Sequence, residues 1–478
     1  MRRRDFLTAS GAGLAAACRA GRAAGPLVPP PATGPRPSPA QLAWQRRELA
    51  VFLHFGVNTF TDREWGDGHE DPHIFAPAAL DARQWTRAAR AGGFRTVILT
   101  AKHHDGFCLW PSRLTSHSVA ASPWRAGAGD VVRELADAAR ADGLGLGVYL
   151  SPWDRHEPSY GDSPRYNDFY CAQLTELLTG YGPVTEVWFD GANGEGPNGR
   201  RQVYDWPRIH QVVRRHQPGA LIFSDAGPDL RWAGNERGVA GDPNWCTVDP
   251  ATVPVPGLSG DAVIASLQHG DPDGSAWRPA ECDVSIRPGW FWHPAEDDDV
   301  RTVEDMLELY LASVGRNSGL LLNVPPTTAG LLHPTDVSRI ARFGARRRAI
   351  FEHDLARDAR VAASSSAPRS RPSSVLDPDP DTRWSAADGA TAASLQLDFP
   401  RPVTFDLISL EEAIAEGQSI SSCTVDSWTG SWTRIAEGTT VGHRRIERVA
   451  PVSTTRLRLS VASRRGPPRV SRLSLHHT

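Results

Sequence analysis

The sequence predicts an α/β fold: a (β/α)8-like TIM barrel, with regular or irregular strands, followed by a C-terminal antiparallel β-sandwich. Three observations favour this class. Apolar runs that end in polar residues alternate with helical segments through most of the chain, and the last hundred residues or so change to a short alternating pattern. The length of 478 residues also exceeds one ordinary domain. A barrel of about 300 residues with a smaller second unit is therefore the natural division.

Five continuous apolar runs are typical of strands buried on both faces. They occupy residues 50–56, 96–100, 146–150, 186–190 and 221–225. Helical segments lie between them, for example residues 79–91 and 131–141, where apolar side chains recur at helical spacing. An open parallel sheet has the same alternation, but a barrel collects all its strand ends at one face. Polar residues after five successive strands therefore favour the barrel, with its chemistry at that face.

The C-terminal part of the chain has the period of half-exposed antiparallel strands. Apolar and polar side chains alternate in residues 395–399 and 456–461. Serine and proline are abundant just before this region, which indicates an inter-domain connection or an irregular first strand. The predicted divisions are a signal segment 1–24, a Pro-rich linker 25–39, a barrel 40–353, a second linker 354–372 and a sandwich 373–478.

The N-terminus has the pattern of a twin-arginine export signal. Arg2-Arg3-Arg4-Asp5-Phe6-Leu7 precedes a weakly apolar Ala/Gly stretch that ends near Ala17 and is too short to span a membrane. We therefore expect an exported protein, periplasmic or extracellular, without a membrane span. Cys18 follows this stretch and is a candidate lipid-modified residue, although Leu14 lies one place further upstream than a lipobox prefers.

The composition excludes some partners and favours others. Acidic and basic residues nearly balance, with a net charge of −3, so nucleic acid is not expected as a partner. The sixteen tryptophans suit the flat faces of sugar rings or the filling of cores. Without Cys18, five cysteines remain at irregular spacing, so we expect reduced, buried thiols and no disulfide framework.

Five motifs in fixed order make the chain similar to a known family. They are FLHFG at residues 52–56, KHHDGF at 102–107, SPW at 151–153, EVWFDG at 186–191 and GRNSGLLLN at 315–323. In this order and spacing they resemble the α-L-fucosidases of glycoside hydrolase family 29, over roughly residues 40–350. The resemblance implies a barrel enzyme that releases L-fucose from glycans, without a cofactor.

Three further stretches refine the resemblance. GNERG at residues 234–238 and ECDVSIRPGWFW at residues 281–292 resemble the branch of the family that prefers α-1,3 and α-1,4 linkages. DPDPDTRW at residues 377–384 is similar to discoidin-like (F5/8 type C) β-sandwich modules. That module would bind glycan through Trp384, Trp428 or Trp432, unless these side chains fill the core. The acidic run Asp377, Asp379 and Asp381 would hold calcium or form a metal-free turn.

Hydrolysis of a glycosidic bond with retention needs two carboxyl groups about 5 to 5.5 Å apart. Asp190 is the predicted nucleophile, because the end of a buried strand would hold it rigidly, and the family's nucleophile falls on the same motif. The alternative role of Asp190 is to cap the following loop or helix. The acid/base lies on a loop, and the candidates are Asp225, Glu236 and Glu281, of which Asp225 is expected to form structural hydrogen bonds at its strand end. In the α-1,3/1,4 branch the acid/base maps onto the loop of Glu236. The alternative role of Glu236 is a surface salt bridge with a neighbouring arginine.

The remaining predicted site residues bind substrate. His54, His103 and His104 would bind hydroxyl groups, since imidazole both donates and accepts. They could instead be buried core residues or zinc ligands, but adjacent histidines on a strand would point to opposite sides, which disfavours a metal site. The resemblance adds the loop of Glu64 and Trp65. The other predicted contacts are Tyr149, Trp188, Glu281, Arg287, Trp290 and Trp292, and the alternative role of Glu281 is to support a residue that itself contacts the substrate.

The sequence thus predicts a retaining, exo-acting α-L-fucosidase that cleaves terminal α-1,3/1,4-linked fucose through a covalent fucosyl-enzyme. Its partners would be fucosylated oligosaccharides or glycoconjugates, and the sequence gives no oligomeric state. One alternative is a broad fucosidase for 1,2-linked or aryl fucosides, with the acid/base at Glu281. The other is a non-catalytic glycan-binding protein on the same scaffold.

Overall fold

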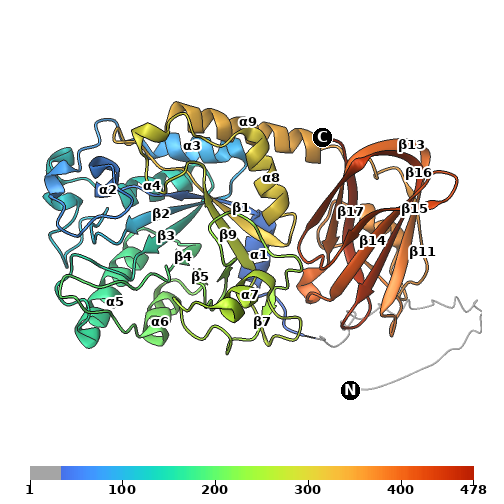
Figure 1. Cartoon of the computed structure of the whole chain (residues 1–478), viewed down its shortest axis with the longest axis horizontal. Coiled ribbons are helices and arrows are strands. Elements are labelled where there is room, and N and C mark those ends of the chain that lie inside the picture. The colour runs from blue at the N-terminus through green and yellow to red at the C-terminus, as the bar shows by residue number, and fades with distance from the viewer. Residues whose placement is uncertain (1–33) are drawn as a thin grey trace, which may run out of the picture. The chain divides into compact units, whose positions relative to one another are not determined.

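The computed structural model describes residues 34–478 (Figure 1). The predicted signal segment, Cys18 and most of the first linker lie outside these residues. The nine α-helices of the described part are α1 Pro39–Arg47, α2 Val57–Thr61, α3 Ala82–Gly92, α4 Val131–Ala141, α5 Ser163–Gly180, α6 Trp206–His216, α7 Asp261–His269, α8 Val303–Ser313 and α9 Pro334–Phe351.

Eight parallel strands form a nearly closed barrel. Their order in space is β5-β4-β3-β2-β1-β10-β9-β6. A parallel bridge between Phe223 and Leu230 joins the two ends of this order, so the predicted barrel, and not the open sheet, is confirmed. The strands are β1 Leu49–Leu53, β2 Thr96–Lys102, β3 Gly145–Leu150, β4 Glu186–Trp188, β5 Leu221–Phe223, β6 Arg231–Trp232, β9 Ala280–Ser285 and β10 Ser318–Asn323, while β7 Thr247–Val248 and β8 Ala276–Trp277 form a separate antiparallel pair.

Aspartate side chains cap the N-termini of α3, α4 and α6. α4 spans the predicted residues, with the Asp130 carboxylate accepting from the backbone N–H of Arg133 at 2.8 Å. α3 begins three residues later than predicted, because Asp81 is its N-cap. Both helices bury their apolar faces in the core around the barrel, and α3 packs against α9 (Figure 1).

The barrel interior has its own aromatic core. Phe52, Tyr149, Trp188 and Phe223 project inward from four strands, and Trp44 of α1 packs against the same cluster. Gly319 leaves the space for Trp44, since a Cβ there would lie 2.7 Å from the indole. The interior is therefore filled with rings up to the level of the candidate site.

The C-terminal unit is an antiparallel sheet structure with the strand order β12-β17-β13-β16-β14-β15, and β11 pairs with β13. The two predicted strands pair directly, with Leu395 opposite Leu459. β11 lies within the predicted second linker and pairs with β13. Of the two alternatives, an inter-domain connection or an irregular first strand, the structure therefore shows the strand. The strands are β11 Arg360–Ala363, β12 Trp384–Ser385, β13 Ala392–Glu412, β14 Ile420–Trp428, β15 Trp432–Gly438, β16 Arg445–Ser463 and β17 Arg469–His476.

The residues proposed for glycan or calcium binding in this unit have different surroundings. Trp384 is fully buried in the sandwich core. Trp428 and Trp432 face each other across the β14–β15 hairpin, with ring centroids 5.4 Å apart, and are half-buried. Asp381 forms an ion pair with Arg46 at 2.5 Å. Trp384 is thus a core residue, and of these three tryptophans only the hairpin pair keeps an accessible aromatic surface.

Buried polar contacts connect the barrel to the sandwich. Asn317, in the left-handed conformation with φ of 62°, accepts from the backbone N–H of His443 at 2.7 Å and donates to the carbonyl of Asn244 at 3.0 Å. Arg444 donates to Glu48 at 2.7 Å. The GRNSG part of the last barrel motif therefore serves the contact with the sandwich.

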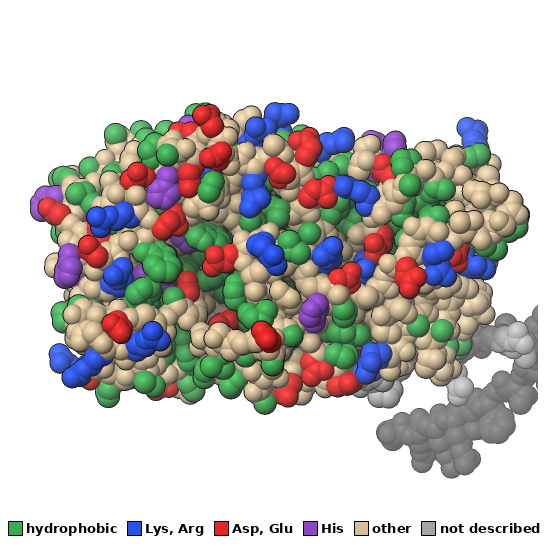
Figure 2. All heavy atoms as spheres, in the orientation of Figure 1, with side chains coloured by type: hydrophobic (Ala, Val, Ile, Leu, Met, Phe, Trp, Pro, Cys, Tyr) green, Lys and Arg blue, Asp and Glu red, His purple; other side chains and the backbone are tan. Residues whose placement is uncertain are grey.

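The surface has no dominant charge on the face shown in Figure 2, where acidic and basic side chains are interspersed. Among residues 34–478, no helix combines the length and apolarity needed to cross a membrane. The five cysteines of this part are buried and unpaired, as predicted.

Candidate active site

A cavity of about 370 Å³ opens at the carboxyl ends of the barrel strands. Ten of the thirteen predicted site residues line it: His54, Glu64, Trp65, His103, His104, Tyr149, Trp188, Asp190, Glu236 and Trp290. Three residues that were not predicted complete the wall: Phe52, Ala192 and Asp283.

Asp190 lies two residues beyond the end of β4 and is fixed at both oxygens. Its Oδ2 accepts from the Tyr149 hydroxyl at 3.0 Å, and its Oδ1 accepts from the backbone N–H of Ala192 at 2.7 Å. Burial raises the pKa of Tyr149 well above its usual value, and the charge of Asp190 adds to the effect. Tyr149 therefore remains a donor, and the carboxylate is held in one orientation.

Trp188 forms the floor beside Asp190. Its ring stacks on Phe223 with centroids 4.1 Å apart, and its indole N–H donates to Glu281 Oε1 at 2.9 Å. Stacking fixes the plane of the indole, and the hydrogen bond fixes its rotation within that plane.

His54 presents an unprotonated nitrogen to the cavity. Asn323 donates its amide hydrogens to Ser285 Oγ and to the carbonyl of Trp290, so its Oδ1 faces His54 Nδ1, 2.8 Å away. Since Oδ1 only accepts, Nδ1 carries the proton and Nε2 is an acceptor. Burial lowers the pKa of His54 to about 3, so the ring is neutral at physiological pH.

His103 and His104 both face the cavity, with ring centroids 4.0 Å apart. The prediction that they point to opposite sides is wrong, because β2 ends at Lys102 and the chain turns there. His104 Nδ1 lies 2.7 Å from Ser151 Oγ, which donates to the Trp153 carbonyl, so His104 must donate and its Nε2 accepts. Burial lowers the pKa of both rings.

The three histidines thus form a neutral, hydrogen-bonding wall. A neutral ring that is fixed at one nitrogen offers the other to a hydroxyl group of a ligand. Within residues 34–478, no group of three or more His, Cys, Asp or Glu side chains has the arrangement of a metal site. The arrangement suits a small polyhydroxylated ligand.

Glu236 also lines the cavity, on the loop that follows β6. Its Oε2 accepts from the indole N–H of Trp290 at 3.4 Å. The side chain is exposed at the cavity mouth, yet partial desolvation by the surrounding protein raises its pKa, and the charges of Asp190 and Glu64 act in the same direction. This carboxyl group is thus biased toward its protonated form.

Glu64 connects two loops at the cavity. It accepts from the backbone N–H groups of Trp290 and Phe291, at 2.9 and 3.0 Å, and lies 2.7 Å from His293 Nε2. Glu64 therefore fixes the loop that carries Trp290, the partner of Glu236. The neighbouring Trp65 is 59% exposed and packs edge-on against Trp153, which makes it a rim residue.

Three predicted substrate contacts lie outside the cavity, contrary to the prediction. Glu281 is buried below Trp188 and supports its indole, which is the alternative role that the sequence left open. Arg287 is fully buried in a bidentate ion pair with Asp336. Trp292 donates to Asp297 at 3.0 Å. Arg287 and Trp292 thus hold the loop after β9 in place without reaching the cavity wall.

Asp225, the third acid candidate, also has a structural contact. Its Oδ2 accepts from the backbone N–H of Gly257 at 2.7 Å, as expected for a structural residue at a strand end. Among the residues that sequence reasoning missed, Asp283 had the clearest signal. It lies two positions after Glu281 and so shares the inner face of β9, and its Oδ1 accepts from Trp232 at 2.7 Å.

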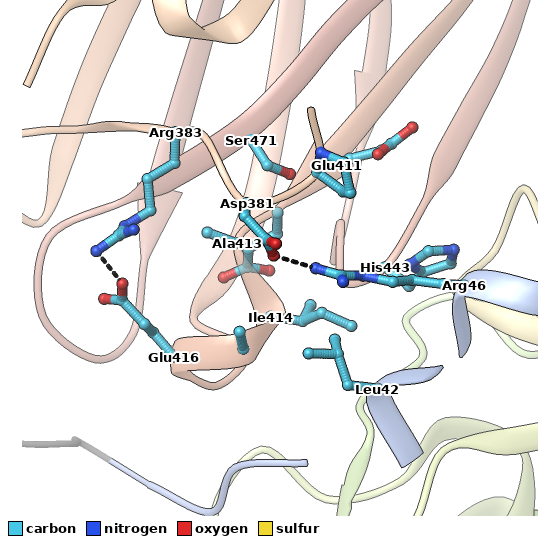
Figure 3. Close-up of a pocket in the computed structure, with 13 residues that line it drawn as sticks. Leu42, Arg46, Asp381, Arg383, Glu411, Ala413, Ile414, Glu416, His443 and Ser471 are labelled. Atoms are coloured by element: carbon cyan, nitrogen blue, oxygen red, sulfur yellow. Dashed lines mark hydrogen bonds and ion pairs between the residues drawn. The ribbon is translucent and has the colours of Figure 1, made fainter. Parts of the chain in front are cut away.

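A second cavity, of about 260 Å³, lies where α1 meets the sandwich (Figure 3). Its charged side chains pair with one another, for example Arg46 with Asp381 and Arg383 with Glu416. This cavity thus lacks the convergent hydrogen-bonding groups of the first one, which remains the candidate active site.

Comparisons with known proteins agree with this geometry. A family model described as alpha-L-fucosidase matches residues 35–346. The chain belongs to the α-L-fucosidase family. The enzyme is accordingly a glycoside hydrolase with α-L-fucosidase activity, and substrates of such enzymes are fucosylated glycans. A second model, the F5/8 type C domain, matches residues 360–474, in agreement with the predicted sandwich.

Similar proteins extend over nearly the whole enzyme. The putative alpha-L-fucosidase 1 of Oryza sativa subsp. japonica is 49% identical over 455 residues, which is 94% of this chain and 86% of that protein. The crystal structure of SpGH29 superposes with a TM-score of 0.88 at 40% identity, covering 94% of this chain and 99% of that one. A Ruminococcus gnavus GH29 fucosidase in complex with fucose has a TM-score of 0.86 at 33% identity, covering 94% and 97%.

The tautomer of His54 can be tested by long-range ¹H–¹⁵N NMR, with His54→Gln used for assignment. We expect a neutral ring protonated at Nδ1 throughout about pH 5 to 8, because its pKa is near 3. In urea the same resonance should titrate like an ordinary histidine, near pH 6.5. Titration near that pH in the folded enzyme, or a proton on Nε2, would contradict the assignment.

Proposed function

We propose that the enzyme retains anomeric configuration, with Asp190 as the nucleophile and Glu236 as the acid/base. The observation that carries this proposal is that the two carboxyl groups line one cavity from the loops after two different strands, β4 and β6. One is fixed by two hydrogen bonds and the other has a raised pKa. A fixed anion and a protonated carboxyl are the two groups that double displacement requires.

In the first step Asp190 attacks the anomeric carbon while Glu236 donates its proton to the glycosidic oxygen. The bond between that oxygen and the anomeric carbon breaks, the aglycone leaves, and a fucosyl ester forms on Asp190. The ester removes the charge of Asp190, one of the charges that raise the pKa of Glu236. Glu236 is then better suited to accept a proton from the water that hydrolyses the ester.

The fucose ring would lie against the histidine wall. The Nε2 atoms of His54 and His104 accept from sugar hydroxyls, while Phe52 and Trp188 give the C5 methyl group an apolar surface. The similar Ruminococcus gnavus enzyme was solved with fucose, which supports a fucose site in this cavity.

For the aglycone we propose α-1,3- and α-1,4-linked glycans. The support is the GNERG loop around Glu236 together with the exposed indole of Trp65 and the half-exposed indole of Trp290 at the mouth, where a second sugar would lie. We also propose export of the enzyme, on the twin-arginine pattern of its N-terminus.

Substitution Glu236→Ala tests the acid/base. We expect hydrolysis of fucosylated oligosaccharides to fall by about 10²- to 10⁴-fold, because their leaving groups need a proton. An aryl fucoside with an acidic phenol should lose less in the first step, and azide should restore its turnover and give α-L-fucosyl azide. The matched control Asp225→Ala should show no azide rescue. Rescue of Glu281→Ala instead would favour the broad-fucosidase alternative.

A panel of defined 1,2-, 1,3-, 1,4- and 1,6-fucosylated oligosaccharides tests the linkage. We expect kcat/KM for 1,3- and 1,4-linkages to exceed the others by at least about tenfold, a difference of about 1.4 kcal/mol in transition-state binding. Trp65→Ala should reduce this preference and leave the hydrolysis of a small aryl fucoside nearly unchanged. Equal rates on all four linkages would contradict the proposal.

A further inference from the structure

Two carboxyl groups are buried inside the barrel below the floor of the active site. Glu186 of β4 and Glu281 of β9 are each 1% exposed. Each accepts from an indole: Trp44 Nε1 donates to Glu186 Oε2 at 3.1 Å, and Trp188 Nε1 donates to Glu281 Oε1 at 2.9 Å. The proposed mechanism uses neither carboxyl group.

The two side chains approach each other closely enough to interact, and a hydrogen bond between them can form only if one of them is protonated. Among the described residues, Glu186 Oε1 is buried and receives no hydrogen bond. Two adjacent carboxylates in a low-dielectric interior cannot both be ionised without a large cost. A single proton on Glu281 supplies the missing donor for Glu186 and removes one of the two charges.

We propose that Glu186 and Glu281 share one proton and act as a positioning pair for Trp188, and through β4 for Asp190. The shared proton is a property of the barrel, whereas its effect on catalysis rests on the proposed function. Glu281 orients the indole that forms the floor, and Glu186 lies on the same strand, four residues before Asp190. Ionisation of the second carboxyl would place two charges under the floor and weaken this arrangement.

The surroundings do not neutralise a second charge. Arg47 of α1 is the cation that acts on Glu186, and its side chain is exposed. Glu48 pairs with Arg444 at the contact with the sandwich. Asp283, on the inner face of β9, holds Trp232 and has a raised pKa of its own, caused mainly by burial. The other side chains around the small cavity beside Glu281 include Leu49, Thr96 and Leu320, which are uncharged.

The pair makes stability depend on pH with a defined sign. Burial raises the pKa of both Glu186 and Glu281 above the usual value of a glutamate. For acids with a raised pKa in the folded state, the stability contribution is complete below the unfolded value of about 4.5 and is lost as pH rises through the folded values. The pair should therefore make the wild-type Tm fall as pH rises above about 5.

Glu281→Gln and Glu281→Leu separate the roles of the pair. In Glu281→Gln the new amide cannot titrate, but its oxygen still accepts from Trp188 and its N–H donates to Glu186. We therefore expect a smaller fall of Tm with pH than in the wild type. Its kcat/KM should stay within about threefold of wild type near pH 6 and persist to higher pH. Glu281→Leu removes both bonds, so kcat/KM should fall by about tenfold or more, with altered Trp fluorescence.

The matched control is Glu412→Gln, a substitution at a buried carboxyl of the sandwich whose pKa burial raises to about 7. It should change the dependence of Tm on pH without shifting the alkaline limb of kcat/KM. An unchanged Tm profile in Glu281→Gln would overturn the shared proton, and wild-type kinetics in Glu281→Leu would overturn the positioning role. Because Tm and fluorescence need no turnover, failure of the proposed mechanism would leave the test of the shared proton intact.

Discussion

A carboxylate held among aromatic rings is the constraint on which the site depends. An anion removed from water costs several kcal/mol unless hydrogen bonds replace its hydration, about as much as the net stability of many domains. Asp190 receives such bonds from Tyr149 and from the backbone of Ala192. Tyr149 belongs to β3, and Ala192 lies in the loop that follows β4, so the scaffold that stabilises the charge also directs it into the cavity.

Desolvation also determines the states of the other polar groups of the cavity. The histidines are neutral because desolvation disfavours their charged forms, and Asn323 and Ser151 determine which nitrogen of His54 and His104 accepts. The same desolvation, with the charge of Asp190, biases Glu236 toward protonation. The same rule holds below the floor of the site. There the buried carboxyl groups accept from indole N–H groups, Glu186 from Trp44 and Glu281 from Trp188. Polar groups inside the barrel thus occur in hydrogen-bonded sets.

The sequence predicts those strands and site residues whose signal lies in a short, continuous stretch of the chain. The apolar runs of β1 to β5 and the pairing strands within β13 and β16 follow from periodicity, and ten cavity residues follow from motifs at strand ends together with the family resemblance. Three features escape such reasoning. β6 has two residues and gives no periodic signal, β9 carries Glu281 and Asp283 on its inner face, and His103 and His104 lie beyond their strand, where alternation no longer applies. Arg287 resembles a ligand-binding residue in sequence, and only the fold reveals its buried partner Asp336.

Covalent trapping would show whether the fixed anion is the nucleophile. The enzyme would be incubated with 2-deoxy-2-fluoro-α-L-fucosyl fluoride, digested and analysed by mass spectrometry, because the fluorine at C2 slows hydrolysis of the ester while the fluoride leaves readily. We expect one fluorofucosyl group per chain, on Asp190, and α-L-fucose as the first product released from an unmodified substrate. A label on Glu236 or Asp225, or β-L-fucose as the first product, would contradict the mechanism.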